Sequence, residues 1–224
     1  QLVDDALTLA FDGYLSYDIA LGVVSYLFRE TDYMPWYPAV MAFDKLDYIL
    51  KGTPLQSQMR RFIRMMVRRL HVTYGMEVLP NDGVLEHFVR ELGIDWTCRV
   101  GDQRCLNYAY NQLQTSDNIP KPLDITFMCN GLKGAGRAPL FVSLHRRFRA
   151  STDQADRLRI LDGLTCSPDV KLLVDLLQST LGSEIQYRSH ERSRIYSNMW
   201  TRTTGGLEAM MQFIVQLYND IPNV

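Results

Sequence analysis

The sequence predicts an all-α chain of stacked antiparallel helical hairpins, a HEAT-like α-solenoid or superhelix. Apolar residues recur at i, i+3, i+4 and i+7 in most windows, which is the period of one buried helix face. Few windows alternate apolar and polar residues as a half-buried strand would. Gly and Pro separate the apolar stripes at short intervals, so about twelve helices of roughly 10–20 residues are expected, joined by short turns.

Three apolar stripes lie in the N-terminal half, within residues 19–27, 59–70 and 85–96. Ser16 is a suitable N-cap for the first of them, because its hydroxyl can accept a hydrogen bond from a free backbone N–H. Between the first two stripes, the segment Met34–Pro38 carries two prolines around two aromatic residues. It is interpreted as a packed turn between two hairpins.

Three further stripes lie in the C-terminal half, within residues 140–148, 172–177 and 207–217. Pro168 and Asp169 form a good helix entry for the second of these, and Gly205 and Gly206 precede the third. The segment 131–136 is rich in glycine but follows a helical stripe, so it is interpreted as a helix–helix turn. A joint is expected at 118–122.

Degenerate helical-hairpin repeats explain this pattern without a strict sequence repeat, because each hairpin needs only to bury a stripe against its neighbour. We therefore interpret residues 1–224 as a single helical-repeat domain, with a compact orthogonal bundle as the alternative. The opening residues are typical of the middle of a helix. The chain is accordingly expected to be a fragment of a larger parent.

Composition narrows the class of partners. The formal net charge is −1, which argues against nucleic acid as a partner, since backbone binding needs an excess of Lys and Arg. No apolar run approaches the roughly 20 residues that span a bilayer, so no membrane insertion by this chain is expected. The four cysteines fit either two disulfides in an oxidising compartment or four buried thiols.

Candidate catalytic and metal-binding residues are few. His190–Glu191 is the one His–Glu dipeptide, and the position four residues after the histidine is Arg194, so a second zinc-binding imidazole is missing. A solvated helix face is the preferred interpretation of this dipeptide. No phosphate-binding loop, dinucleotide-binding pattern or nucleophile elbow occurs. We therefore predict no catalytic residue and no metal ligand in this chain.

Arginine is clustered in three places. One group lies opposite the apolar stripe of 59–70, and a second is Arg137, Arg146, Arg147 and Arg149. The third is Arg188, Arg192, Arg194 and Arg202. Solvated helix faces are one interpretation. The other is that one group lies on a concave surface and binds a carboxylate, because a guanidinium group suits bidentate contacts. The third group is the candidate.

Several segments resemble the C-terminal helical domain of aminopeptidase N-like zinc peptidases, a family that includes endoplasmic-reticulum and insect gut aminopeptidases. They are Leu2–Ala10, Gly13–Leu21, Ser25–Leu27 and Glu30–Trp36, and the cysteine segments Trp96–Cys98, Gly101, Cys105, Cys129–Gly131 and Leu164–Cys166. The resemblance implies HEAT-like hairpins and the disulfides Cys98–Cys105 and Cys129–Cys166. It covers most of the chain and weakens after Leu181.

The resemblance also implies a function. The chain would be a non-catalytic lid and scaffold domain of a secreted or cell-surface zinc aminopeptidase that removes N-terminal residues from peptides. The zinc and the catalytic residues would lie in the parent's catalytic domain, which would be the main partner. Other expected partners are a peptide C-terminus at Arg188, Arg192, Arg194 or Arg202, a second copy of the chain, or another protein.

One segment departs from the family pattern. Residues Gly136–Leu140 lack the acidic residues and tryptophan that relatives carry there. This favours an alternative: a protein-binding ectodomain module of an aminopeptidase-like pseudoenzyme or receptor. The parent's upstream sequence would separate the two functions, because an intact His-Glu-x-x-His followed by a distal Glu indicates an active enzyme.

Overall fold

The computed structural model describes residues 1–77, 79–115, 121–134, 136–182 and 185–220. In these ranges the chain forms twelve α-helices, one 3-10 helix and no strand, so the predicted all-α class is confirmed. The chain divides into two compact units, Gln1–Cys105 and Leu106–Val224. That residues 1–224 form a single repeat domain stays a prediction, and part of the expected joint at 118–122 lies outside the described residues.

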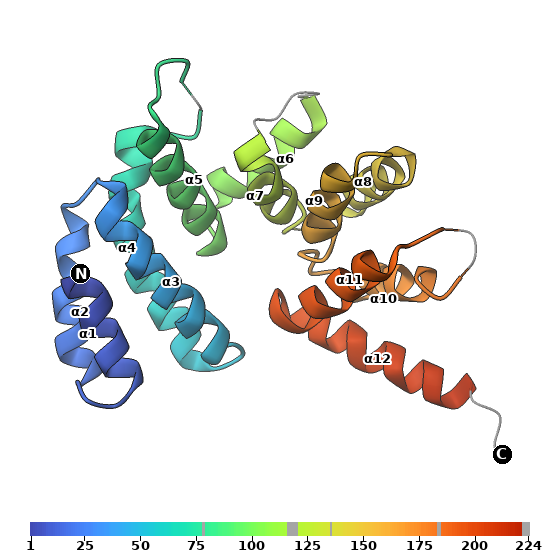
Figure 1. Cartoon of the computed structure of the whole chain (residues 1–224), viewed down its shortest axis with the longest axis horizontal. Helices are drawn as coiled ribbons and strands as arrows, with labels where there is room; N and C mark the ends of the chain where they lie inside the picture. The colour runs from blue at the N-terminus through green and yellow to red at the C-terminus, as the bar shows by residue number, and fades with distance from the viewer. Residues whose placement is uncertain (78, 116–120, 135, 183–184, 221–224) are drawn as a thin grey trace. The chain divides into compact units, whose positions relative to one another are not determined.

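The first unit is formed by consecutive helices that pack against one another. They are α1 (Leu2–Phe11), α2 (Tyr17–Val24), η1 (Ser25–Phe28), α3 (Tyr33–Ile49), α4 (Pro54–Tyr74) and α5 (Val84–Arg99). Helix α1 packs against α2 and α3, and α4 packs against α5, as Figure 1 shows in the blue and green part of the chain. Such neighbouring pairs are the hairpins that the short connections predict.

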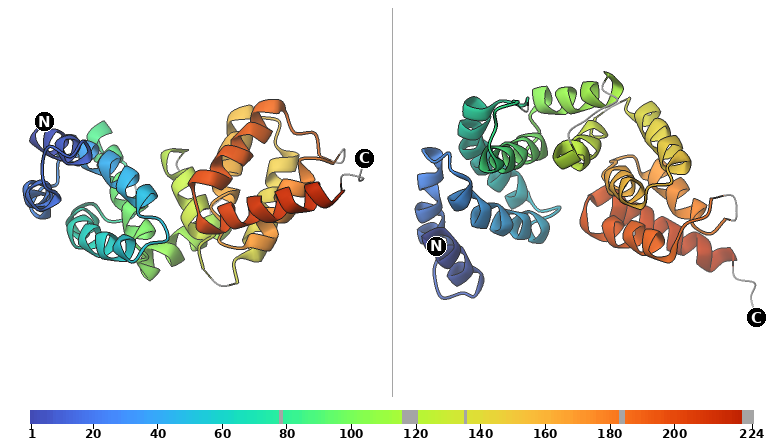
Figure 2. Two further views of the ribbon diagram at one scale, coloured as in Figure 1. Left: turned by 90° about the horizontal axis from the view of Figure 1, so that it is seen from below. Right: turned by 45° about the horizontal axis from the view of Figure 1, so that its top comes forward.

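The second unit contains the remaining helices, with α6 beginning just before the boundary. They are α6 (Gln103–Thr115), α7 (Lys121–Gly131), α8 (Ala138–Ala150), α9 (Gln154–Leu164), α10 (Val170–Ser179), α11 (Ser189–Thr201) and α12 (Thr204–Asp220). Helix α9 packs against α7, α8 and α11, and α12 lies against α10 and α11 (Figures 1 and 2). Helix α9 is therefore the central element of this unit.

The apolar periodicity explains the buried faces of α4 and α8, whereas in α5 the stripe residues Leu85 and Phe88 are exposed. In α4 the residues Ile63, Met66, Val67 and Leu70 are buried, as the stripe of 59–70 predicts. In α8 all four residues of the predicted stripe are buried: Leu140, Phe141, Leu144 and Phe148. The entry at Asp169 is also confirmed, because its carboxylate accepts hydrogen bonds from the backbone N–H groups of Lys171 and Leu172.

The interpretation of Met34–Pro38 as a turn is wrong, because these residues form the first turns of α3. A helix leaves its first four N–H groups without an internal partner, so Pro35 costs no hydrogen bond there. Trp36 is fully buried and its indole N–H donates to the carbonyl of Glu30 at 3.1 Å. This anchor holds the start of the helix despite Pro38 inside it.

The expected stripe of α12 is only partly correct. Met210 is buried, but Leu207, Met211, Ile214 and Leu217 are exposed, and the buried face consists of Ala209, Met210 and Phe213. The helix also begins at Thr204, before the two glycines. Gly206 is needed for packing, because a Cβ there would lie 2.6 Å from the carbonyl oxygen of Met199.

Candidate functional site

The four arginines predicted as a carboxylate site do not form one group. Arg188 is the N-cap of α11 and Arg202 is its C-cap, so the helix separates them. Arg194 and Arg202 both pair with Asp162 of α9. Arg188 and Arg192 instead line a pocket with residues from α8, α9 and the segment before α11. The structure thus places them as two separate pairs, and a contact of any of them with a carboxylate or a partner stays a prediction.

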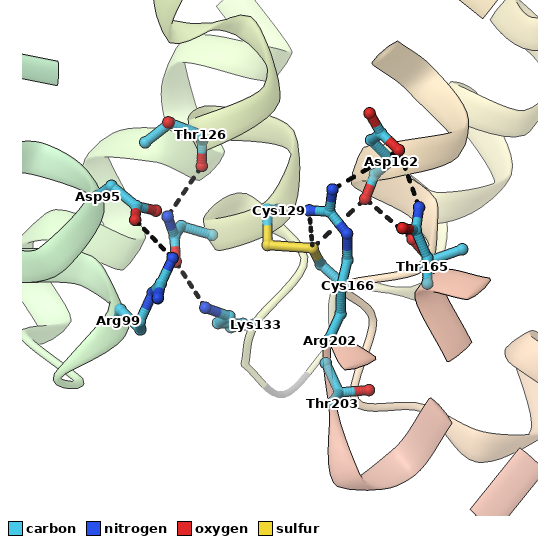
Figure 3. The surroundings of a disulfide bond; sticks show 12 residues. Asp95, Arg99, Thr126, Cys129, Lys133, Asp162, Thr165, Cys166, Arg202 and Thr203 are labelled. Carbon is cyan, nitrogen blue, oxygen red and sulfur yellow. Dashed lines mark hydrogen bonds and ion pairs between the residues drawn. A yellow bond between two sulfur atoms is a disulfide. The ribbon is translucent and has the colours of Figure 1, made fainter. Parts of the chain in front are cut away.

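Asp162 is the acceptor of the first pair. Its side chain is 2% exposed and accepts two hydrogen bonds from Arg194, at 2.7 and 2.6 Å, and one from Asn198 at 2.8 Å. Arg202 lies 3.6 Å away and also donates to Sγ of Cys166 (Figure 3). Arg194 and Arg202 provide the positive charge that the buried Asp162 carboxylate needs. A ligand would have to compete with Asp162 for the same N–H donors.

We expect Asp162 to make unfolding in the second unit sensitive to acid. Burial alone would raise its pKa, but the hydrogen bonds from Arg194 and Asn198 and the nearby Arg202 charge lower the pKa below its usual range. A lowered folded-state pKa stabilises the chain above about pH 4, and this stability is lost as pH falls through the folded value.

The measurement is urea denaturation from pH 7 to pH 3 for the native chain and for Asp162→Asn. At pH 7 the variant should lose about 2 kcal/mol of unfolding free energy, because charge-assisted hydrogen bonds to a buried group are replaced. The difference between the two proteins should shrink toward pH 3. A difference that stays constant across this range would contradict the assignment.

Arg188 and Arg192 belong to a pocket of about 680 Å³ in the second unit. We call it the arginine pocket. Four arginines line it, Arg149 from the end of α8, Arg157 from α9, and Arg188 and Arg192 from the start of α11. The other lining residues come from the segment just after α8 and from the segment before α11: Ser151, Thr152, Ile185, Gln186 and Tyr187. Residues separated by more than 40 positions in the sequence thus meet at one concave surface.

Arg157 is held by Glu191. The interpretation of His190–Glu191 as a solvated helix face is correct for His190, which is exposed, and wrong for Glu191. Glu191 is fully buried, and its oxygens accept from Nε and Nη2 of Arg157 at 2.6 and 3.0 Å. It also accepts from the backbone N–H of Arg188 at 2.9 Å, which caps α11. Burial opposes ionisation, but these hydrogen bonds lower the pKa of Glu191.

Tyr187 forms a rigid side of the arginine pocket. Its ring stacks on Phe148 with centroids 5.3 Å apart, and its hydroxyl lies 2.9 Å from Oγ of Ser179 and 3.2 Å from Nε2 of His145. Burial raises the pKa of Tyr187, despite its hydrogen bond to Ser179. Burial, together with the nearby charge of Arg149, lowers the pKa of His145. Both side chains therefore favour their neutral forms at neutral pH.

The charge of the arginine pocket is not balanced within the described residues. Glu191 neutralises Arg157, whereas no carboxylate in the described ranges lies within ion-pair distance of Arg149, Arg188 or Arg192. Arg188 has a neutral partner, the side-chain carbonyl of Gln154. Arg149, Arg188 and Arg192 are all exposed residues. The site can accordingly attract anions, and oxyanions in particular.

No group of three or more His, Cys, Asp or Glu side chains that could hold a metal ion occurs in the described part of the chain. In the same part, no helix combines the length and apolar character needed to cross a membrane.

All four cysteines are paired, Cys98 with Cys105 and Cys129 with Cys166, the pairing that the resemblance implies. The second disulfide joins α7 to the turn after α9 (Figure 3).

Two pocket residues were not part of the predicted site. Arg149 belongs to the second arginine group of the sequence, and Arg157 belongs to none of the three groups. The structure places Glu191 three residues after the N-cap of α11, the position of a capping-box glutamate, but the N-cap residue is Arg188 and not the Ser or Thr that marks this motif in a sequence. No sequence signal identified Arg157 as the partner of Glu191, because the two residues meet across 34 positions of sequence.

Comparison with known proteins adds to this geometry. The family model described as the ERAP1-like C-terminal domain matches residues 1–224. Aminopeptidase N of Plutella xylostella is 26% identical over 230 residues, covering 100% of this chain and 24% of that protein. The thyrotropin-releasing hormone-degrading ectoenzyme of Mus musculus is 28% identical over 196 residues, covering 82% and 18%. Membrane alanyl aminopeptidase of Heliothis virescens is 27% identical over 188 residues, covering 79% and 18%. The chain thus spans about a quarter or less of the length of these relatives.

Proposed function

Because this chain belongs to the ERAP1-like C-terminal domain family, we propose that it is the non-catalytic lid and scaffold domain of a zinc aminopeptidase that removes N-terminal residues from peptides. The observation that carries the proposal is the family match over residues 1–224, together with relatives whose names are those of aminopeptidases. In this proposal the catalytic domain of the parent holds the zinc and is the principal partner of the chain.

We propose a secreted or cell-surface location for the parent. Two disulfides support it, because such bonds persist in oxidising compartments. The names of two relatives describe them as a membrane enzyme and an ectoenzyme.

The arginine pocket supplies the proposed contact with a peptide. Arg194 and Arg202 are engaged by Asp162, so the contact with a C-terminal carboxylate falls to Arg188 and Arg192. A planar guanidinium can donate two parallel hydrogen bonds to a carboxylate. The pocket would then bind the end of the peptide that the catalytic zinc does not process.

If the zinc lies in the parent's catalytic domain, the isolated chain should have no aminopeptidase activity. Tight catalytic zinc needs three protein ligands around an open position. The purified chain, prepared without chelators, is expected to contain no stoichiometric zinc and to leave an aminoacyl fluorogenic substrate uncleaved. Metal analysis and the fluorescence assay check this, and stoichiometric zinc with chelator-sensitive turnover would overturn the proposal.

The scaffold part is tested in a related enzyme. The aminopeptidase N of Plutella xylostella is truncated before the segment that aligns with this chain, and residues 1–224 are fused in its place. The fusion should regain hydrolysis of a long peptide that the truncated enzyme lacks. A fusion that folds, binds zinc and stays as inactive as the truncated enzyme would instead favour the protein-binding ectodomain module.

A further inference from the structure

We propose that the arginine pocket selects peptides whose C-terminal residue is Asp or Glu, so that two carboxylates enter the pocket together. The inference rests on the proposed function for the contact with a peptide C-terminus. It goes further by assigning Arg149 to the site and by naming the class of peptide that the site prefers.

The charge of the pocket carries the inference. Arg149, Arg188 and Arg192 bring three positive charges, and none has a carboxylate partner among the residues that the structure describes. One terminal carboxylate would balance only one of them. An acidic C-terminal residue brings a second carboxylate, and each can accept paired hydrogen bonds from a different guanidinium.

Arg157 is a positioning residue and not a ligand. Its Nε and Nη2 donate to Glu191, its Nη1 donates to the carbonyls of Phe148 and Ser151, and its Nη2 reaches the carbonyl of Gln186. All its donors are therefore used within the protein. The guanidinium also lies 4.0 Å from the centre of the Phe148 ring. This set of contacts joins α8, α9 and the start of α11, the elements that carry Arg149, Arg188 and Arg192.

The size of the pocket also favours a whole residue over a small ion. The pocket is open to solvent, and its volume of about 680 Å³ lies within the usual range of small-molecule sites. Arg149 comes from α8, whereas Arg188 and Arg192 come from α11 and its cap. A C-terminal Asp or Glu carries a terminal carboxylate and a side-chain carboxylate a few bonds apart. Each of these carboxylates could contact a guanidinium from a different helix.

The test compares four peptides, each with its N-terminus blocked by an uncharged fluorophore of the BODIPY type, in fluorescence anisotropy titrations with the whole chain. Their sequences are Ala-Ala-Ala followed by Glu, Gln, Glu-amide or Gln-amide. Low salt is used, because exposed charges are screened at higher ionic strength. The Glu-ending peptide should bind at least tenfold more tightly than the Gln-ending and Glu-amide peptides, each of which carries one carboxylate.

Variants assign the effect to the pocket. Arg149→Gln and Arg192→Gln should each reduce the preference for Glu over Gln below threefold. Arg146→Gln is the matched control, since Arg146 is exposed on α8 and does not line the pocket. It removes the same charge and should leave the preference unchanged. Unfolding curves that match the native chain will confirm that each variant is folded.

Different failures have different meanings. Equal binding of the Glu-ending and Gln-ending peptides, with weaker binding of Gln-amide, overturns the acidic-residue inference and leaves the carboxylate contact of the proposed function intact. Equal binding of all four peptides overturns both. A loss of preference in Arg146→Gln as large as that in Arg192→Gln would show a general effect of charge and would also overturn the inference.

Discussion

Replacement of Glu191 by alanine is expected to lower the free energy of unfolding by about 3–5 kcal/mol. The carboxylate is fully buried and is the charge partner of Arg157, whose side chain is 11% exposed. Removing one partner of a buried ion pair leaves an uncompensated charge and unsatisfied donors, which is far more costly than the net value of the pair. The variant also loses the cap on the backbone N–H of Arg188.

Urea denaturation monitored by circular dichroism measures this loss. Glu208→Ala is the matched control, because Glu208 is an exposed glutamate of α12, and its substitution should change stability by less than about 0.5 kcal/mol. The double variant Arg157→Met, Glu191→Met should recover much of the stability, since it leaves no unpaired charge. Similar losses for Glu191→Ala and Glu208→Ala would refute the buried pair.

Removal of the Cys129–Cys166 disulfide is expected to cost about 4 kcal/mol. The two cysteines are separated by 37 positions, so the bond removes considerable freedom from the unfolded chain. The disulfide also links α7 to the turn after α9 (Figure 3). Helices α7 and α9 pack against each other. The double variant Cys129→Ala, Cys166→Ala avoids a free thiol and isolates this effect.

The other disulfide is an internal reference. Cys98 and Cys105 are separated by 7 positions, for which the same relation gives about 2.5 kcal/mol. Unfolding free energies of the two double variants should therefore differ by more than 1 kcal/mol, with the wide loop the more costly to open. The reverse order would show that local packing around the cysteines outweighs the entropy of the unfolded chain.

Helix formation was predictable because it depends on near neighbours in the sequence. The stripes of α4 and α8 bury the expected residues, since side chains three and four positions apart share one face wherever a helix forms. Asp169 was predictable as a cap for the same reason, as its carboxylate bonds to N–H groups two and three residues away.

Predictions were less reliable where a distant contact decided the outcome. Met34–Pro38 has the composition of a turn, but the burial of Trp36 favours a helix there. In α12 nearly every turn is apolar, so periodicity alone could not select the buried face. The neighbours α10 and α11 select it, by covering Met210 and Phe213 and leaving Met211 exposed.

The sequence by itself determined the all-α class, the positions of most helices and, through its resemblance to a family, the pairing of the cysteines. Only the tertiary structure decided which arginines line the pocket and which pair with a buried carboxylate. Arg194 and Arg202 satisfy Asp162, whereas Arg149 joins Arg188 and Arg192 at the arginine pocket. The physical reason is that a buried carboxylate needs a cation within hydrogen-bonding distance. Asp162 and Arg194 are more than 30 positions apart in the sequence, so only the folded chain brings them together.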